Sequence, residues 1–516
     1  MQSGATSLVE TAVRAGVEIC FANPGTTEMP IVLALDQVRG MRPVLGLFEG
    51  VCTGAADGWA RMRGRPAATL LHLGPGLANG IANLHNARRA RTPVVNWVGD
   101  HTTQHLPVDS VLTSDIAALT GSVGWTGTVA RAADMASASL EAVRTALGAP
   151  GRVASLIIPA NCQWEPGPPA STERPAPVVR AVDAALVREA AQRLRASGSV
   201  LFLGSTALTE RGQRAAARVA AATGCTVWVE TFPSRQERGR HLPAFRQLPY
   251  FPEEASKALA PATCLVLAGA REPVAMFGYP GMPSRFTLPA VPRVPLADPD
   301  AGDDATAALE ALVDELGAPE VPNLGVQPPA FTPTGAALDP DALGRTVAAC
   351  TPEGSIVVNE AATAGLHWAQ LHSPGALPHT VLGLTGGGIG QGLPTALGAA
   401  LACPDRRVIA FEADGSGLYT VQALWSMARE GTDVTVVICS NRRYRILQLE
   451  LARVTQTPGP AGRGLTDLSN PEIDWTQLAR GFGVRATRAT TDTELAAAMQ
   501  RASSESGPSL IEAVLA

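Results

Sequence analysis

Short aliphatic segments alternate with helical segments along almost the whole chain, and this alternation restricts the fold more than any other feature. In the first 170 residues the aliphatic segments include VEICFANPG, AATLLHLGPG and PVVNWVGD, each followed by a helical pattern. Strands separated by helices form parallel βαβ units. Aromatic residues make up only 4% of the chain, so the buried strands are built from Ala, Val and Leu. We therefore expect an α/β fold with parallel sheets.

Two stretches rich in proline and glycine divide the chain. They cover residues 164–180 and 317–340. A length of 516 residues also suggests about three domains, at roughly 150 residues each. We expect three doubly wound parallel-sheet domains at 1–170, 181–335 and 341–516. The first and third have similar length and layout, as expected for related modules.

Composition and charge exclude several kinds of function. The formal net charge is −5, and no basic cluster with interleaved aromatic residues is present, so nucleic acid is a poor candidate partner. Lys257 is the single lysine and lies in an ordinary helical stretch, which disfavours a Schiff-base mechanism with pyridoxal phosphate. The eight cysteines are far apart and form no CxxC pair. They are therefore expected to be reduced core residues, without a disulfide or zinc framework.

The expected location is the cytoplasm. The first residues, MQSGATSLVE, lack a basic segment followed by an apolar one, so they do not form a secretory signal. The uncharged stretch 380–404 is long enough to cross a bilayer, but glycines and prolines interrupt it. We expect no membrane span.

Polar residues follow two aliphatic strands in the third domain. The first strand is expected to end at Glu412 and the chain to turn through Asp414, while the second strand delivers Asn441. Consecutive parallel strands end at the same edge of a sheet, so Asp414 and Asn441 are expected to converge there. A carboxylate, an amide oxygen and a backbone carbonyl suit Mg²⁺. Taken alone, an Asp-Gly turn and a strand-end asparagine without a bound metal are the simpler explanation.

The segments Ala413-Asp414-Gly415 and Ser440-Asn441 resemble the diphosphate-binding motif of thiamine diphosphate enzymes of the decarboxylase and acetohydroxyacid synthase group. That motif is Gly-Asp-Gly followed, one strand later, by one or two asparagines. Ala413 and Ser440 replace the usual first glycine and first asparagine. The resemblance implies that Asp414, Asn441 and the carbonyl of Arg443 hold Mg²⁺. It also implies that Gly415 and Ser416, with Thr363 as a further candidate, contact the cofactor's diphosphate.

Glu49 lies in a second segment that matches this family. Leu47-Phe48-Glu49-Gly50 is expected to end a strand, and the helical segment VCTGAADGWARMRG follows with small residues that allow close packing. The resemblance implies that Glu49 bonds N1′ of the aminopyrimidine. That bond favours the imino tautomer, whose 4′-nitrogen removes the thiazolium C2 proton. Read alone, Glu49 is a solvated charge at a strand end.

The glycine-rich segment 386–390 is the third match. A backbone almost without side chains allows a flat ring to approach closely. By resemblance, Ile389 would wedge the cofactor into a bent conformation, Gly388 would lie against it, and the carbonyl of Gly387 would bond the 4′-amino group. The simpler alternative is a glycine-rich entry to a helix.

Within this family, benzoylformate decarboxylases are the most similar group. The segment Asn-Pro-Gly-Thr-Thr-Glu at 23–28 resembles one in that group and has Thr26 at the position of a substrate-binding serine. His72, at the end of the expected strand AATLLHL, is at the position of a proton-transferring histidine. The segment after TCLVLAG lacks the second active-site histidine of that group, and Phe277 or Tyr279 is expected in its place. Ile446 is a further pocket candidate. His101 and His105 are weaker candidates for proton transfer.

The resemblance implies a thiamine diphosphate- and Mg²⁺-dependent 2-oxo acid decarboxylase or carboligase that acts through an enamine. The Gly-Pro-Gly at 74–76 resembles acetohydroxyacid synthases, so an acetolactate synthase-type carboligase is the alternative. FAD is not expected. In the family the cofactor lies between the first domain of one subunit and the third of another. A homodimer is then the minimum assembly, and a homotetramer is expected, with a small 2-oxo acid as the partner molecule.

Two hypotheses from other functional classes remain. Residues 74–79 open a helix after a strand and Asp100 ends the next strand, which is the layout of an NAD-dependent oxidoreductase. Asn79 stands where the dinucleotide-binding motif has glycine or alanine. This hypothesis would also leave Asp414, Asn441 and Glu49 without a role. The replacements Ala413 and Ser440 also fit an inactive regulatory homologue, although such a protein would not require Glu49.

Overall fold

The computed structural model describes residues 2–178, 180–321, 325–327, 331–455 and 457–516. Its strands form three sheets, which confirms the expected α/β fold with parallel-sheet domains. The chain divides into two compact units. The first contains Met1–Pro177, Thr332–Leu366 and Leu384–Ala516, and the second contains Val178–Phe331 and His367–Gly383. The three domain boundaries remain predictions.

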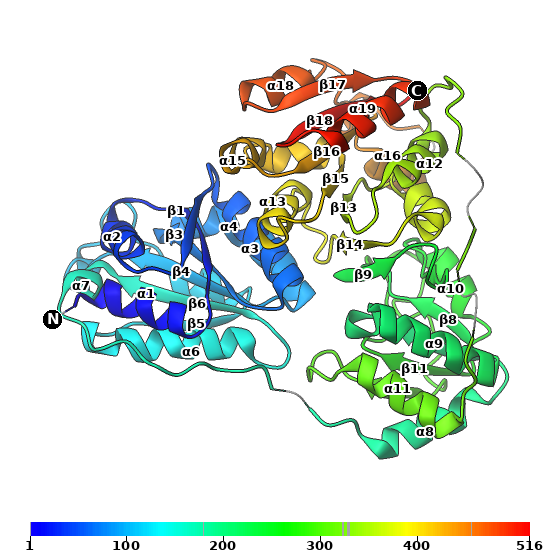
Figure 1. The fold of residues 1–516 in the computed structure, drawn as a ribbon, viewed down its shortest axis with the longest axis horizontal. Helices are drawn as coiled ribbons and strands as arrows, with labels where there is room; N and C mark the ends of the chain where they lie inside the picture. Colours follow the sequence, from blue (N-terminus) through cyan, green and yellow to red (C-terminus); the bar gives the residue numbers. More distant parts are fainter. Residues whose placement is uncertain (1, 179, 322–324, 328–330, 456) are drawn as a thin grey trace. The chain divides into compact units, whose positions relative to one another are not determined.

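The N-terminal sheet of the first unit has the order β2-β1-β3-β4-β6-β5, and every neighbouring pair is parallel. Helices α1 and α6 cover one face, and α3 and α4 cover the other (Figure 1). The strands are β1 (Ile19–Asn23), β2 (Arg42–Leu45), β3 (Ala67–His72), β4 (Val94–Asp100), β5 (Trp125–Thr128) and β6 (Val153–Pro159). The helices are α1 (Gly4–Arg14), α2 (Met29–Gln37), α3 (Glu49–Arg63), α4 (Leu73–Ala90), α5 (Ile116–Gly121), α6 (Met135–Leu147) and α7 (Ala160–Trp164).

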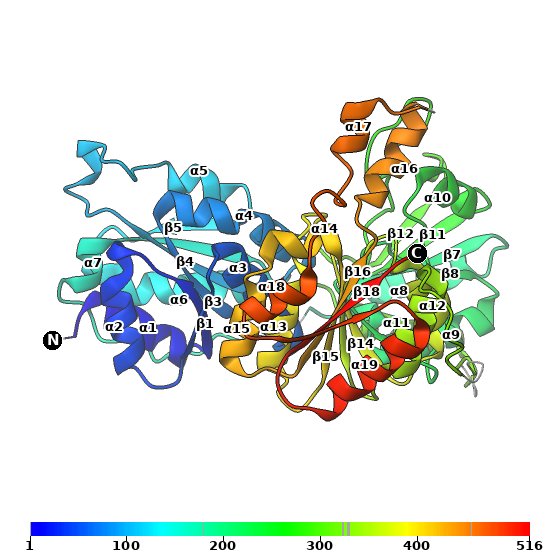
Figure 2. The ribbon, with the colours of Figure 1, turned by 90° about the horizontal axis from the view of Figure 1, so that it is seen from above.

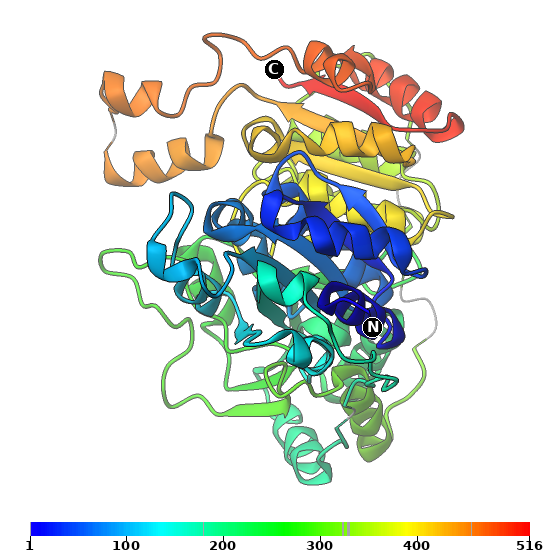
Figure 3. The same cartoon turned by 90° about the vertical axis from the view of Figure 1, so that its left-hand side faces the viewer.

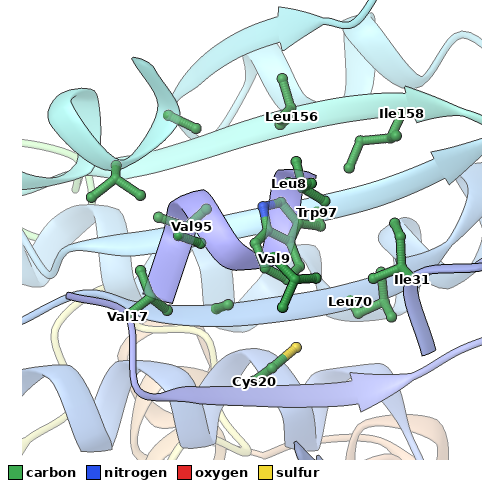
Figure 4. Packing of buried hydrophobic residues seen from close by; sticks show 14 of the residues in the cluster. Leu8, Val9, Val17, Cys20, Ile31, Leu70, Val95, Trp97, Leu156 and Ile158 are labelled. Carbon is green, nitrogen blue, oxygen red and sulfur yellow. The ribbon is translucent and has the colours of Figure 1, made fainter. Parts of the chain in front are cut away.

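The core of this sheet is aliphatic, as its composition predicts. Val95 and Trp97 of β4 pack against Leu8 and Val9 of α1, and all four side chains are fully buried (Figure 4). Burying an apolar side chain of this size contributes roughly 1.5–3 kcal/mol. This packing holds the strands whose carboxyl ends carry His72 and Asp100.

The second unit contains a parallel sheet with the order β10-β8-β7-β11-β12. An antiparallel pair joins β9 (Arg235–Arg238) to β14 (His379–Gly383). The sheet strands are β7 (Ser199–Leu203), β8 (Thr226–Val229), β10 (Arg246–Gln247), β11 (Cys264–Ala268) and β12 (Arg293–Ala297). The helices are α8 (Ala184–Leu194), α9 (Glu210–Thr223), α10 (Pro252–Leu259) and α11 (Ala305–Leu316).

The C-terminal sheet of the first unit runs β17-β18-β16-β15-β13, again with parallel neighbours. Helices α16 and α17 extend away from this sheet, and no residue of α16 is buried (Figures 2 and 3). The strands are β13 (Ile356–Glu360), β15 (Val408–Ala413), β16 (Val434–Ser440), β17 (Arg485–Ala489) and β18 (Ser509–Val514). The helices are α12 (Pro340–Cys350), α13 (Gly392–Ala402), α14 (Asp414–Gly417), α15 (Ala423–Glu430), α16 (Arg445–Val454), α17 (Pro460–Gly464), α18 (Trp475–Gly481) and α19 (Asp492–Ser504).

Two expected element boundaries were wrong. Strand β2 ends at Leu45, and Glu49 is the first residue of α3 instead of the end of a strand. A carboxylate in the first turn of a helix is favoured by the helix dipole. Strand β15 continues through Glu412 to Ala413, and α14 begins at Asp414 where a turn was expected.

Helices α3 and α13 approach each other very closely, because both carry glycine at the contact. A Cβ atom at Gly58 would lie 2.1 Å from the Thr395 carbonyl oxygen, and one at Gly398 would lie 1.9 Å from the Ala55 carbonyl oxygen. Such distances exclude any side chain at these two positions. The small residues that the sequence shows in α3 therefore have a packing role.

We expect Gly398→Ala to destabilise the protein by about 1–3 kcal/mol, because the added methyl group would force the two helix backbones apart. Chemical denaturation of the purified protein measures this change. Gly121→Ala is the matched control, since nothing lies within 4 Å of the Cβ position at Gly121. Equal stability of the two variants would contradict the proposed packing role of Gly398.

Two carboxyl groups lie side by side beneath α13. The parallel register pairs Glu360 of β13 with Glu412 of β15, and both side chains are buried. Glu360 accepts hydrogen bonds from the backbone N–H groups of Gly390 (2.8 Å) and Gly392 (2.5 Å). Burial raises the pKa of Glu360 to about 7. Burial also raises the pKa of Glu412 well above its usual range, and the neighbouring Glu360 adds to that rise.

These two carboxyls bind protons more tightly in the folded protein than in the unfolded chain. Their contribution to stability is therefore complete at low pH and is lost as the pH rises, for Glu360 from about 4.5 through about 7. We expect the unfolding free energy of the apoprotein to show this decline, and Glu412→Gln to flatten it. Denaturation curves across this pH range measure both effects. An identical pH dependence in the wild type and in the variant would contradict the assignment.

Candidate active site

Asp414 and Asn441 converge at the carboxyl edge of the C-terminal sheet. Strands β15 and β16 are neighbours, and Ala413 pairs with Cys439. One carboxylate oxygen of Asp414 accepts the backbone N–H of Gly415 (2.8 Å), and the other accepts that of Arg442 (2.6 Å). The two loops are thus joined directly, as the parallel-strand argument predicted.

The environment of Asp414 fits a cation. Its side chain is buried, burial raises its pKa, and no basic side chain among the described residues forms an ion pair with it. Asn441 Oδ1 accepts the N–H of Arg443 (2.9 Å), and the Arg443 carbonyl accepts the N–H of Arg445 (3.0 Å). Each of these oxygens keeps a free lone pair. Mg²⁺ prefers this set of hard oxygen donors.

This donor set contains only one acid. Within the part of the chain that the structure describes, no group of three or more His, Cys, Asp or Glu residues forms a metal site. Asp414, Asn441 and the Arg443 carbonyl would therefore hold the ion together with oxygen atoms of a bound ligand. Ser416 is buried in α14 beside them. A Cβ at Gly415 would lie 2.4 Å from the ring of Tyr444, which explains the need for glycine there.

Glu49 lies at the start of α3, close to the beginning of α4. Its Oε2 accepts a hydrogen bond from the Asn79 carboxamide (3.0 Å). A Cβ at Gly76 would lie 3.1 Å from Glu49 Oε1 and 3.3 Å from the Cβ of His72. Gly76, in the first turn of α4, therefore lies close to both Glu49 and His72. This close approach explains why glycine is needed at position 76. A dinucleotide-binding role is therefore not required to explain the Gly-Pro-Gly segment.

His72 ends β3 and is paired with a buried acid. Its Nδ1 lies 2.8 Å from Oε2 of Glu28, which has no exposed surface, whereas 24% of the His72 side chain is exposed. Because a carboxylate only accepts hydrogen bonds, Nδ1 carries the proton in this contact. Glu28 also accepts the N–H of Gly25 (2.7 Å). The ring is therefore held by one edge, and its Nε2 is left for other partners.

The sequence predicted a substrate-binding role for Thr26 and did not indicate Glu28 as the partner of His72. The Thr26 side chain is exposed, and the hydroxyl within reach of His72 Nδ1 is that of Thr27 (3.3 Å). The spacing of Gly25 and Glu28 could have indicated this role for Glu28. As in a capping box, the carboxylate accepts the backbone N–H of the residue three positions earlier. The substrate-binding role of Thr26 remains a prediction.

The glycine-rich segment 386–390 is bound from two sides. The N–H groups of Gly390 and Gly392 donate to Glu360, and Thr420 donates its hydroxyl to the Gly390 carbonyl (2.9 Å). From the other side, residues of α4 bind the carbonyls of Gly386, Gly388 and Gly390. Gly387 and Gly390 have φ angles of +74° and +91°, which disfavour other residues. Ile389 is half-buried between them.

The other candidates contribute less to this geometry. His101 Nε2 lies 3.1 Å from the Ser110 hydroxyl, and the rings of His101 and His105 are 5.2 Å apart. Ile446 lies on α16, which has no buried residue. The roles predicted for Thr363, Phe277 and Tyr279 remain predictions.

No helix within the described ranges is both long and apolar enough to cross a membrane.

Known proteins resemble this chain along most of its length. Residues 2–120 match the family model for the N-terminal TPP-binding domain of thiamine pyrophosphate enzymes, and residues 363–513 match the C-terminal TPP-binding domain. A Mycobacterium tuberculosis protein with the provisional name acetolactate synthase large subunit IlvX is 47% identical, over 99% of both chains. Benzoylformate decarboxylase of Pseudomonas aeruginosa is 32% identical, over 97% of this chain and 96% of its own.

A solved structure shows the same fold along the full length. The thiamine diphosphate-dependent 4-hydroxybenzoylformate decarboxylase of Rhodococcus jostii RHA1 superposes with a TM-score of 0.86 at 27% identity, covering 100% of this chain and 99% of that one. The chain therefore belongs to the thiamine pyrophosphate enzyme family, in the group that contains the decarboxylases and acetolactate synthases.

Proposed function

We propose that this enzyme is a Mg²⁺-dependent 2-oxo acid decarboxylase that can also act as a carboligase. The observation that carries the proposal is the pair of Glu28 and His72 beside Glu49. The short contact between them supports a role as proton donor and acceptor, near the acid that family resemblance assigns to the cofactor's pyrimidine ring. Thiamine diphosphate, when bound, supplies the carbon nucleophile that adds to the carbonyl of a 2-oxo acid.

Each residue of the site has a proposed task. Glu49 holds a proton against the pyrimidine ring, and Asn79 orients the Glu49 carboxylate through its hydrogen bond. Asp414, Asn441 and the Arg443 carbonyl hold Mg²⁺, which neutralises the diphosphate. His72, oriented by Glu28, exchanges a proton at Nε2 with the reacting carbonyl oxygen or with the carbon that loses CO₂. Protonation of that carbon, followed by removal of the proton on its oxygen and cleavage of its bond to the cofactor, would release an aldehyde.

A carboligase of the acetolactate synthase type is the second candidate. The 47% identity with the Mycobacterium tuberculosis protein favours it. Both reactions share the loss of CO₂ and differ in whether a proton or a second carbonyl reacts next. The product distinguishes them.

We further propose that the enzyme is at least a homodimer, with a homotetramer expected. Apolar side chains of two segments of the first unit are exposed, which marks surfaces that bind other chains. They are Val108, Val111 and Leu112 before α5, and Leu447, Val454 and Leu465 in and after α16. Analytical ultracentrifugation of the holoenzyme tests the assembly, and a monomer would overturn this proposal. A cytoplasmic location and the lack of FAD remain predictions.

We expect Glu49→Gln to lower CO₂ release by about 10²–10⁴-fold, because glutamine cannot exchange a proton with the pyrimidine ring. The measurement begins with apoprotein titrated with thiamine diphosphate and Mg²⁺. CO₂ and products are then followed with pyruvate, benzoylformate and branched 2-oxo acids. Glu18→Gln removes a surface acid as the control and leaves the rate unchanged. Failure of the wild type to bind the cofactor would overturn the proposed function.

His72→Ala is expected to reduce aldehyde formation by about 10²–10⁴-fold, because the proton donor is lost. Glu28→Gln should cause a smaller loss and change the pH profile of kcat/KM, since the imidazole loses its charged partner. Steady-state kinetics across pH measure both effects, with His241→Ala as a histidine control in the second unit. Wild-type kinetics in Glu28→Gln would contradict the role of the pair.

A further inference from the structure

Gly390, the last residue of the glycine-rich segment, is held through both of its backbone polar groups. Its N–H donates to the buried carboxylate of Glu360 on β13 (2.8 Å), and its carbonyl accepts the hydroxyl of the buried Thr420 (2.9 Å). Thr420 ends the 3₁₀ helix Leu418–Thr420, which directly follows α14. These two side chains form a clamp on Gly390, and both belong to the C-terminal sheet and its loops.

The clamp continues into the start of α13. The second carboxylate oxygen of Glu360 accepts the N–H of Gly392 (2.5 Å), the first residue of that helix. Tyr419 packs directly on Gly390, where an added Cβ would lie 2.5 Å from the Cβ of Tyr419. Gly390 also has a φ angle of +91°, which glycine adopts without strain. The clamp therefore holds the end of the glycine-rich segment in one conformation.

The elements that form the clamp also carry the candidate metal ligand Asp414. Glu360 pairs in register with Glu412, the residue before the end of β15, and Asp414 begins α14 directly after that strand. Thr420 follows α14 on its other side. The clamp thus joins the glycine-rich segment to both sides of the loop that contains Asp414.

These two regions belong to the same part of one chain. The family resemblance places the cofactor between the first domain of one subunit and the third domain of another. The glycine-rich segment and Asp414 both lie in the expected third domain, so they face the same cofactor molecule. Glu49 at that site would come from the other subunit. The clamp therefore concerns only contacts that a single chain makes with a single cofactor.

We propose that Thr420 and Glu360 are positioning residues that hold Ile389 in place relative to the Mg²⁺ ligands. The proposal rests on the proposed function and on the wedge role that family resemblance assigns to Ile389. Both side chains act through the backbone of Gly390, which directly follows Ile389. Without the clamp, the diphosphate would still bind at Asp414, but the pyrimidine ring would lose its support.

Thr420→Val tests the clamp, because it removes one hydroxyl and keeps nearly the same side-chain shape. The Gly390 carbonyl keeps a second donor, the Asn83 carboxamide (3.2 Å), so it is not left without a partner. We expect the variant to bind thiamine diphosphate with Mg²⁺ about fivefold more weakly, the loss typical of one hydrogen bond. Binding of inorganic diphosphate with Mg²⁺ should change less than about twofold, since that ligand lacks the pyrimidine ring. Isothermal titration calorimetry of the full-length protein measures both dissociation constants.

Two further variants sharpen the test through the ratio of the two dissociation constants, thiamine diphosphate over inorganic diphosphate. Thr420→Ser keeps the hydroxyl and should retain the wild-type ratio. Glu360→Gln should raise the ratio about tenfold or more, because an amide NH₂ group replaces one of the two oxygens that accept the N–H groups of Gly390 and Gly392. If Glu360→Gln does not fold, the two Thr420 variants decide the question.

Thr346→Val is the matched control. Thr346 is a buried threonine of α12 whose hydroxyl donates to the Ala342 carbonyl within the same helix (2.7 Å). The substitution makes the same chemical change as Thr420→Val at a position without a bond to the glycine-rich segment. It should lower the melting temperature without changing the ratio of the two dissociation constants.

The outcomes separate this proposal from the proposed function. An unchanged ratio in Thr420→Val, an altered ratio in Thr420→Ser, or an equal change in Thr346→Val would overturn the positioning role. If the wild-type protein binds inorganic diphosphate but not thiamine diphosphate, the proposed function itself fails. A selective loss of thiamine diphosphate binding in Thr420→Val supports the clamp.

Discussion

The close packing of α3 against α13 is the constraint on which the candidate site depends. Gly58 and Gly398 bring the two helix backbones into direct contact, without side chains between them. Helix α3 begins at Glu49, and α13 begins two residues after Gly390. The distance between the helices therefore sets the distance between Glu49 and the glycine-rich segment. A single methyl group at the contact would change both positions.

Buried polar groups then fix the orientation of this contact. Asp57 of α3 pairs with Arg61 at 2.5 Å, and it also accepts hydrogen bonds from Thr92 and Gln391. A buried ion pair contributes little net stability, because desolvation of the charges offsets their attraction. Removing one partner is nevertheless costly, so the network strongly favours one arrangement. Through Gln391 this arrangement fixes the start of α13.

The sequence predicted the strands that carry the site better than the side chains that complete it. Asp414 and Asn441 could be placed together because parallel strands end at one edge, and the structure joins their loops through the N–H of Arg442. Glu360 and Glu412 gave no such signal. Each is one acid in an aliphatic segment, and only the pairing of β13 with β15 shows that both are buried. Strand β5 was missed because its four residues include only one aromatic and no aliphatic side chain.

The sequence by itself determined the fold class, the alternation of strands and helices, and the family, because these follow from local periodicity and from motifs a few residues long. Only the tertiary structure decided which polar side chains meet. Glu28 reaches His72 across 44 positions, and Asn83 reaches Gly390 across 307. Contacts between residues so far apart depend on how whole helices and strands pack. Local patterns do not encode that packing, because the same polar residues in the same pattern are equally compatible with side chains exposed on the surface.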